Sequence, residues 1–257
     1  MTMTDPKKVA IRAAKKAGRI LLKLSKKKIL FEKKGTFDVC AEADLECEKA
    51  IIDELRRHFP GHSILSEEKG LETKPSEYIW IIDPLDGTLN FINGIDEYCV
   101  SIALLKGDEI ILGVILQPTG KKLYVAEKGK GATLNGKSIH VSEKTVLAEM
   151  IATTDNFAKE SERIQGFEMV RKVAIKARTL RIFGSAALHL AKVAEGKIDF
   201  YFKGNFVKWD NAAGMIIVEE AGGRVTDWSG KKASMDSKNV IASNKSCHDE
   251  IIRIINS

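Results

Sequence analysis

The sequence lacks the features that would place it in a membrane or outside the cell. No apolar run is long enough to span a bilayer, and the polar, basic start has no apolar core of the kind that a signal peptide needs. The cysteines show neither paired nor zinc-type spacing; they are Cys40, Cys47, Cys99 and Cys247. We therefore expect a cytoplasmic protein with reduced thiols and no membrane partner.

Internal repeats and low-complexity linkers are also missing from the 257 residues. A chain of this length can bury a substantial core, either as one large unit or as two lobes. We expect one compact body of two fused lobes, at approximately 1–146 and 147–257.

Basic residues exceed acidic ones, with 41 lysines and arginines against 35 aspartates and glutamates and a net charge of +6. Much of the excess lies between Lys7 and Lys34, where lysines occur in runs. Such runs can contact nucleic acid, but they are usually solvated helix faces. We expect no nucleic-acid partner.

The first half of the chain is predicted to contain two helices followed by strands. Asp5-Pro6 has the order of a helix cap and first-turn proline, and a second helix ends at Pro60-Gly61. Strands are predicted at 63–66, 78–83, 99–105, 110–116 and 123–126, in an antiparallel arrangement. The second half alternates strands at 151–154, 180–183, 198–202 and 240–242 with helices near 161–177, 186–195 and from Asp210, before a short closing helix.

The most informative stretch runs from Trp80 to Thr88, where an apolar segment ends in two aspartates. Hydrophobic residues followed by Asp-Pro indicate a buried strand that stops at its carboxyl end. Because proline holds the preceding residue extended, Asp83, Asp86 and the Leu85 carbonyl can converge on one small volume. Oxygen ligands without nearby Cys or His favour Mg²⁺, Mn²⁺ or Ca²⁺ over zinc. The alternative for this stretch alone is a polar turn after a core strand.

Two other acidic residues could join this site. Asp210 precedes an apolar helix that ends at Gly222-Gly223, and it could equally cap that helix. Glu67 follows the predicted strand 63–66 at its carboxyl end, which would bring it beside Asp83. Its alternative role is an ordinary surface charge.

Together these segments resemble the inositol monophosphatase family, whose signatures are a W-x-x-D-P-[IL]-D-G-T-x-N-F run and a distant W-D-x-A-A-G helix. The matches are Trp80 to Phe91, Trp209 to Gly214, Asp38-Val39 with Ala43-Asp44, Ser66-Glu67-Glu68, Gly131-Ala132 with Asn135-Gly136, and Phe183 to Ala187. The resemblance implies a mixed α+β and α/β fold, a layered α-β-α-β-α sandwich of the sugar phosphatase type. It also implies metals at the junction of the lobes.

The resemblance assigns metal ligands residue by residue. Glu67, Asp83 and the Leu85 carbonyl would hold one Mg²⁺. Asp83, Asp86 and Asp210 would hold a second, so that Asp83 bridges the two ions. Mn²⁺ is an expected substitute, and a third, weaker ion is also implied.

Catalytic residues follow from the same matching. Thr88 with Glu67 would activate water, while Asp44 would support Thr88 and the third ion. Asp44 alone would be read as a first-turn acidic residue of a helix. Lys33 matches a family lysine beside the weakly bound metal, although the register of the Lys33-Lys34 loop is open.

Substrate contacts are implied at the turn after the strand and at a second helix start. The implied set is Asp86, Gly87, Thr88, Gly184, Ser185, Ala186, Lys203 and Asp210. Backbone donors of Gly87 and Thr88 would bind phosphate. Gly184 to Ala186 would face the alcohol portion, with capping by Ser185 as the alternative.

Lys203 departs from the family pattern. Members devoted to inositol phosphates often carry a carboxylate at this position to hold ring hydroxyls. A lysine cannot accept hydrogen bonds from hydroxyls, but it could pair with a second phosphate, as fructose 1,6-bisphosphate would provide. The alternative is a lysine that points to solvent.

A rival motif occurs at Gly131 to Ser138, which matches the phosphate-loop pattern G-x-x-x-x-G-K-[ST]. That mechanism needs a helix directly after the lysine. Ile139-His140-Val141 alternates like a strand instead, and Asn135-Gly136 is typical of a hairpin corner. We therefore expect no nucleotide triphosphate hydrolysis.

The resulting hypothesis is a Mg²⁺-dependent phosphatase that cleaves small sugar or cyclitol phosphates, inositol-1-phosphate first. Fructose-1,6-bisphosphatase or dual-specificity activity is the alternative, and 3′,5′-bisphosphate nucleotidase or histidinol-phosphatase activity is a weaker one. A basic binding protein that has lost catalysis is disfavoured, because all the implied ligands are present. The resemblance implies a homodimer or higher homo-oligomer.

Overall fold

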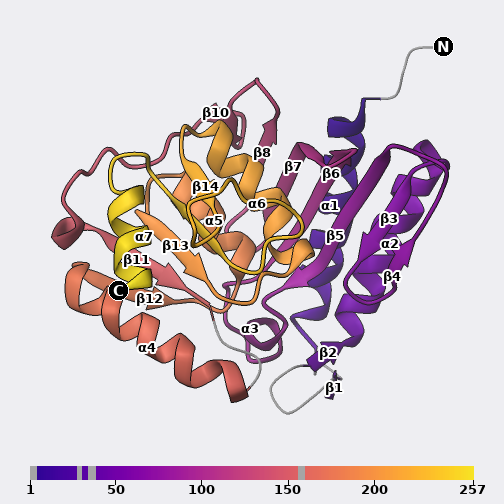
Figure 1. Ribbon diagram of the computed structural model, residues 1–257. Helices are drawn as coiled ribbons and strands as arrows, with labels where there is room; N and C mark the ends of the chain where they lie inside the picture. The colour runs from indigo at the N-terminus through magenta and orange to yellow at the C-terminus, as the bar shows by residue number, and fades with distance from the viewer. Residues whose placement is uncertain (1–4, 28–30, 34–38, 156–159) are drawn as a thin grey trace.

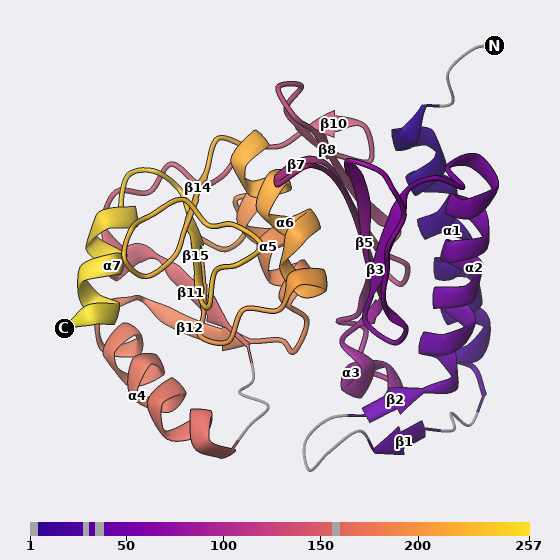
Figure 2. The same cartoon turned by 45° about the vertical axis from the view of Figure 1, so that its right-hand side comes forward.

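The structure of the protein is a computed structural model that describes residues 5–27, 31–33, 39–155 and 160–257, and it has five layers (Figures 1 and 2). One outer layer holds helices α1 (Pro6–Leu24) and α2 (Glu42–His58), the middle layer α5 (Ala186–Ala194) and α6 (Lys208–Glu220), and the other outer layer α4 (Glu160–Lys176) and α7 (His248–Asn256). An eight-stranded and a five-stranded sheet separate these helical layers. The predicted α-β-α-β-α sandwich is confirmed.

Helix α1 begins where the sequence predicts. Asp5 is its N-cap, and the side chain accepts a hydrogen bond from the Lys7 amide at 2.9 Å, with Pro6 in the first turn. Its buried stripe from Val9 to Leu21 packs with α2 against the outer face of the large sheet.

The eight-stranded sheet carries the first half of the chain. In spatial order its strands are β10 (Lys137–Ser138), β9 (Ala132–Leu134), β8 (Lys122–Glu127), β7 (Glu109–Gln117), β6 (Cys99–Lys106), β5 (Tyr78–Asp86), β3 (Ser63–Ser66) and β4 (Gly70–Glu72). Both faces are buried: in β6, Val100, Ile102 and Leu104 face the outer helices, whereas Ala103 and Leu105 face the middle layer.

The predicted antiparallel arrangement is wrong for β3, which pairs parallel with β5. The reason is that β4 turns back along the outer edge of β3, so the chain enters β5 in the same direction as β3. Parallel strands end at one edge of a sheet. The carboxyl ends of β3 and β5, which precede Glu67 and contain Asp83, therefore lie side by side.

The five-stranded sheet mixes parallel and antiparallel pairs. Its order is β12 (Thr179–Ile182), β11 (Ile151–Thr154), β13 (Phe200–Lys203), β15 (Val240–Ser243) and β14 (Arg224–Thr226). The predicted strand at 198–202 starts two residues later and ends one later than expected. The elements that the sequence analysis did not predict are the short β1 (Phe31–Lys33), β2 (Val39–Ala41), β4, β9, β10, β14, the helix α3 (Thr88–Ile92) and the 3₁₀ turn η1 (Leu147–Glu149).

Small residues let the middle helices lie close to their neighbours. A Cβ added to Gly113 of β7 would stand 2.5 Å from the backbone oxygen of Ala213 in α6. A Cβ on Gly214 of α6 would stand 2.5 Å from Leu190 of α5. The positions of α5 and α6, which carry site residues at their first turns, are thus set by close backbone contact.

The phosphate-loop alternative is excluded by local structure. Asn135 and Gly136 have positive φ, and β9 and β10 pair across them as a hairpin, with Leu134 opposite Lys137. Lys137 and Ser138 form β10, and residues 139–146 are irregular rather than the expected strand, so no helix begins directly after Lys137.

The described residues contain no helix that is long and apolar enough to cross a membrane. The division into lobes at residue 146 stays a prediction. The middle core draws side chains from both sides of that boundary, such as Ile81 and Tyr124 with Leu190 and Ile216.

Candidate active site

A pocket of about 180 Å³ opens where the strand ends of the large sheet meet the first turns of α5 and α6. Its wall is unusually rich in carboxylates. The lining residues are Glu67, Asp83, Leu85, Asp86, Gly87, Thr88, Leu89, Asn90, Asp155, Gly184 and Asp210. The structure thus brings together all five metal ligands that the resemblance implies.

A bulge at the end of β5 orients the side chains of Asp83 and Asp86. The pairing with β6 changes register between Asp83, opposite Ser101, and Asp86, opposite Cys99. Asp83 is 1% exposed, and its Oδ1 accepts a hydrogen bond from the Leu85 amide at 3.0 Å. Because a bulge inserts an extra residue, both carboxylates can reach one side of the sheet edge.

Gly87 is required by the turn that follows. Its φ is +96°, and an added Cβ would lie 2.8 Å from the Glu97 carbonyl oxygen. Both the left-handed conformation and this close approach exclude a side chain. The turn delivers Thr88 as the first residue of α3.

Thr88 contacts the helix layer on the far side of the sheet. Its Oγ1 lies 3.1 Å from Asp44 Oδ1 and 3.0 Å from the Leu85 carbonyl oxygen, and it can donate to either. Asp44 is fully buried in the first turn of α2, where it also accepts a hydrogen bond from the Ala41 amide at 2.8 Å. Asp44 does not line the pocket, but it contacts Thr88, which does, and its charge contributes to the raised pKa of Asp83.

Glu67 reaches the pocket because its backbone is fastened to β5. The Glu67 amide donates to the Ile82 carbonyl at 3.2 Å. Behind it, the buried Glu48 of α2 accepts hydrogen bonds from Ser66 Oγ and from the Lys69 amide, which holds the loop after β3. Glu48 escaped the sequence analysis, since nothing distinguishes it from other helix glutamates.

Asp86 is held by the start of α5. Its Oδ2 accepts hydrogen bonds from Ser185 Oγ at 2.6 Å and from the Ala187 amide at 2.7 Å, and its Oδ1 accepts one from the Ala186 amide at 3.2 Å. Helix N-terminal amides favour such an anion.

Ser185 and Ala186 are turned to Asp86 rather than to the pocket, and their contact with the substrate stays a prediction. Both are fully buried and hold Asp86, and only Gly184 of that trio lines the pocket. Capping by the Ser185 side chain is wrong, because its hydroxyl donates to Asp86.

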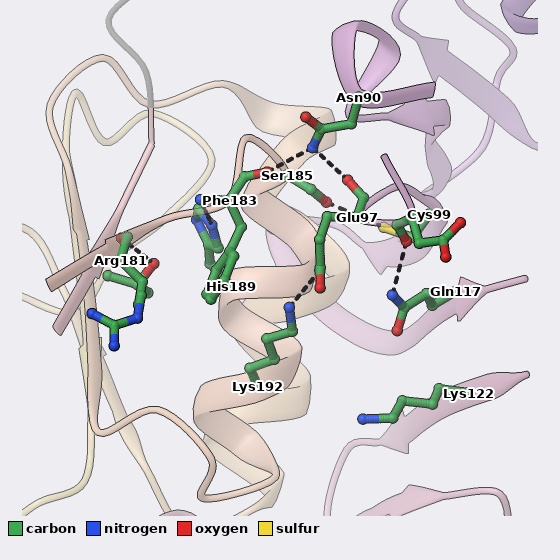
Figure 3. Close-up of polar contacts among 12 residues, drawn as sticks. Asn90, Glu97, Cys99, Gln117, Lys122, Arg181, Phe183, Ser185, His189 and Lys192 are labelled. Atoms are coloured by element: carbon green, nitrogen blue, oxygen red, sulfur yellow. Dashed lines mark hydrogen bonds and ion pairs between the residues drawn. The ribbon is translucent and has the colours of Figure 1, made fainter. Parts of the chain in front are cut away.

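Asn90 ties the loop before α5 to the turn after β5 (Figure 3). Its Nδ2 donates to the carbonyls of Glu97 at 2.7 Å and Phe183 at 2.6 Å. Lys192 pairs with the Glu97 carboxylate and lies 4.1 Å from the centre of the Phe183 ring. These contacts join segments that are far apart in sequence, and they keep the start of α5 against Asp86.

Lys203 has neither of the two environments that the sequence analysis considered. It is 7% exposed, so it does not point to solvent, and it is absent from the pocket wall. Its Nζ lies 3.0 Å from Asp210 Oδ2 and 3.2 Å from Asp155 Oδ2. Lys203 is a buried cation behind two wall carboxylates.

Asp155 was missed, although a signal existed. It follows the predicted strand 151–154 at its carboxyl end, the same position that made Glu67 a candidate. Asp210 lies in the first turn of α6, whose N-cap is Val207, so the alternative of a capping aspartate is wrong.

The electrostatics of the wall reflect crowded negative charge. Burial, followed by the charges of Glu67 and Asp86, raises the pKa of Asp83 well above its usual range. Burial and the charges of Asp210 and Asp155 raise the pKa of Asp86 to about 7. Such a group of carboxylates is stabilised by cations.

The chemistry of this donor set fits hard divalent ions, because it offers four carboxylates and the Leu85 carbonyl and no sulfur or imidazole. Among the described residues, no three acidic, His or Cys side chains meet closely enough to form a finished metal cage. Asp86 is instead turned to α5 and Asp210 to Lys203. Lys34 and Asp38 lie outside the described residues, and nothing is described of the Lys33 side chain.

Comparison with known proteins agrees with this site. The sequence model of the inositol monophosphatase family matches residues 3–257. The chain is 39% identical to a Thermotoga maritima fructose-1,6-bisphosphatase/inositol-1-monophosphatase, over 96% of this chain and 94% of the relative. It is also 39% identical to inositol monophosphatase 2 of Solanum lycopersicum, over 96% and 97% respectively.

Solved structures show the same fold. A Bartonella henselae extragenic suppressor protein suhB superposes with a TM-score of 0.94 at 36% identity, covering 97% of this chain and 98% of that one. A Thermotoga maritima IMPase gives 0.92 at 38% identity, covering 98% and 97%.

Proposed function

Because the chain belongs to the inositol monophosphatase family and is therefore a metal-dependent phosphatase, we propose that its substrate is a small polyol monophosphate, inositol-1-phosphate first. The observation that carries this proposal is the pocket in which Glu67, Asp83, Asp86 and Asp210 share a wall with the Gly87-Thr88 turn. The acids can hold cations, and the turn can hold a phosphate between them.

The ions are proposed to be Mg²⁺, two or three in number, with Mn²⁺ as a substitute. Glu67, Asp83 and the Leu85 carbonyl would hold one ion, and Asp83, Asp86 and Asp210 another. When bound, divalent ions lower the pKa of water and neutralise the oxygen of the departing alkoxide.

The protein's own residues would position the reactants. The Gly87 and Thr88 amides would orient the phosphate, and Asp44 would orient the Thr88 hydroxyl, which lies 3.1 Å from it. Thr88 and Glu67 would then take the proton of the attacking water, directly or through one another. Asp44 would help to hold a third ion through the same corner of the site.

Fructose 1,6-bisphosphate is the second candidate, favoured by the name of the Thermotoga relative, a fructose-1,6-bisphosphatase/inositol-1-monophosphatase. The less favoured candidates are a 3′,5′-bisphosphonucleotide and histidinol phosphate. A homodimer or higher assembly and the lack of a nucleic-acid partner stay predictions. The described cysteines Cys47, Cys99 and Cys247 are free thiols, which supports a cytoplasmic location.

The test is phosphate release from a panel of these esters while Mg²⁺ is titrated. Activity should need Mg²⁺, and Asp86→Asn should lower kcat/KM by more than about 100-fold, since even partners of metal ligands are worth 10- to 100-fold. Asp108→Asn, a change of an exposed acid between β6 and β7, is the matched control and should behave as wild type. Full activity of Asp86→Asn would refute the metal assignment.

A further inference from the structure

Asp155 is a fifth carboxylate on the pocket wall, and it has no role in the metal binding or catalysis proposed above. Its side chain is 11% exposed and lines the pocket together with Asp210 and Gly184. The residue directly follows β11, so its backbone is anchored by the five-stranded sheet. Because Asp155 lines the same pocket as the Gly87-Thr88 turn, which would hold the phosphate, it can contact another part of the substrate.

Lys203 holds the Asp155 carboxylate in position and pairs with its charge. The lysine is buried behind the wall, 3.2 Å from Asp155 and 3.0 Å from Asp210. If Asp210 turns its charge to a metal ion, Asp155 remains as the counter-charge of Lys203. The pair is then neutral overall, with its carboxylate toward the pocket and its ammonium behind.

We propose that Asp155 is a specificity-determining residue that accepts a hydrogen bond from a hydroxyl of the substrate alcohol, with Lys203 as the positioning residue that holds it. This inference rests on the proposed function. A carboxylate only accepts hydrogen bonds, so it selects donors such as hydroxyls. A second phosphate offers almost only acceptors, so it cannot supply the hydrogen bond that Asp155 accepts, and its negative charge lies closer to the carboxylate than to the ammonium behind it. The site therefore prefers polyol monophosphates to sugar bisphosphates.

The proposal also accounts for the lysine at position 203. Family members devoted to inositol phosphates often carry a carboxylate at this position. In this chain the carboxylate comes from β11 instead, and Lys203 of the neighbouring strand β13 supports it from behind. A phosphate that bound Lys203 would compete with Asp155 and Asp210, which both contact its ammonium.

The experiment compares myo-inositol 1-phosphate with fructose 1,6-bisphosphate at saturating Mg²⁺ in wild type and Asp155→Asn. Asparagine keeps the size of the side chain and removes its charge. For the monophosphate, kcat/KM should fall roughly tenfold or more, mainly through KM, because a hydrogen bond to a charged group is lost. The bisphosphate should gain or hold its kcat/KM, so the bisphosphate-to-monophosphate ratio should rise at least about tenfold.

Asp199→Asn is the matched control. Asp199 is 2% exposed and also pairs with a lysine, Lys144, at 2.9 Å, but it lies at the opposite end of β11, where it accepts a hydrogen bond from the Ile151 amide. This variant should keep the wild-type ratio, whatever its effect on thermal stability. Melting curves of all variants confirm that they fold.

Lys203→Gln separates the proposal from a direct phosphate clamp. If Lys203 bound a second phosphate, this variant would lose bisphosphate activity selectively, and the proposal would be wrong. We expect instead that the ratio does not fall. An equal loss for both substrates in Asp155→Asn, or an unchanged ratio, would likewise overturn the role of Asp155. If the wild type hydrolyses neither substrate, the proposed function fails and this inference fails with it.

Discussion

At the scale of single residues, three of the wall carboxylates, Asp83, Asp86 and Asp210, are oriented by three different partners. Asp83 is turned by the Leu85 amide, Asp86 by the first turn of α5, and Asp210 by Lys203. Burying these carboxylates and holding them close together disfavours their charged forms, which the raised pKa of Asp83 and Asp86 reflects. The hydrogen bonds thus fix the positions of the side chains, and a bound cation would favour their charged forms.

Gly87→Ala should destabilise the protein by about 2–4 kcal/mol, because it combines left-handed strain with overpacking against the Glu97 carbonyl. Gly107→Ala is the control: its φ is +56°, but no atom lies within 4 Å of an added Cβ. It should cost only about 1–2 kcal/mol. Chemical denaturation measures both, and equal losses would show that the close contact at Gly87 is unimportant.

At the scale of elements, the site depends on where four of them end or begin. The strands β3 and β5 end at one edge because they are parallel. Helices α5 and α6 start opposite that edge and bring the α5 amides and Asp210 to it. Moving one helix would therefore disturb the site without touching an acidic residue.

Gly113→Ala tests this dependence. The new Cβ would lie 2.5 Å from the backbone of α6, which must shift, at a cost of about 1–3 kcal/mol. Since α6 carries Asp210, we expect a higher Mg²⁺ concentration for half-maximal activity as well as a lower denaturation midpoint. Gly61→Ala, which meets nothing within 4 Å, should change neither by much. If Gly113→Ala had the same Mg²⁺ dependence as wild type, the packing of α6 against β7 would have no effect on the metal site.

At the scale of the whole molecule, two buried histidines, His189 and His248, link the fold to pH, because burial lowers the pKa of each from 6.5 to about 4. His248 is the one that can be tested away from the pocket. His248 is fully buried between Thr226 Oγ1 at 2.8 Å and Ser243 Oγ at 2.7 Å. Burial, with a smaller contribution from Arg224, lowers its pKa from 6.5 to about 4. Between pH 6.5 and pH 4, His248 is protonated in the unfolded chain but neutral in the folded chain. The free energy of unfolding therefore falls as the pH drops from about 6.5 to about 4.

On the acid side of this range, the lowered pKa of His248 reduces the free energy of unfolding by about 3 kcal/mol, because each pKa unit corresponds to 1.36 kcal/mol. His248→Gln should remove this reduction, so the free energy of unfolding should vary less between pH 6.5 and 4 than in wild type. His140→Gln, at an exposed position, is the control and should keep the wild-type slope. Denaturation at several pH values decides the matter, and parallel slopes for wild type and His248→Gln would contradict the assignment.

Much of the fold was readable because both sheets are built from strands with strong apolar patterns. The predicted β11 at 151–154 matches the structure, and the cap at Asp5 starts α1 as expected. The direction of β3 was not readable, because it depends on where β4 attaches rather than on any residue of β3. Short strands such as β9 and the edge strand β10 were not predicted for a similar reason: pairing with neighbouring strands stabilises them, and their few residues carry too little pattern.

The sequence by itself determined the donor chemistry, because spacing along one strand and its turn places Asp83, Asp86 and Gly87 together whatever surrounds them. Only the tertiary structure decided which side chains share the wall. Asp155 and Lys203 stand 48 residues apart in sequence, and Ser185 stands 99 residues from Asp86, so their contacts arise from the packing of sheets and helices. The local sequence determines the backbone conformation that a segment prefers and the type of ligand atom that it offers. The partner of a buried charge depends on distant segments, because these pack around the charge and exclude water from it.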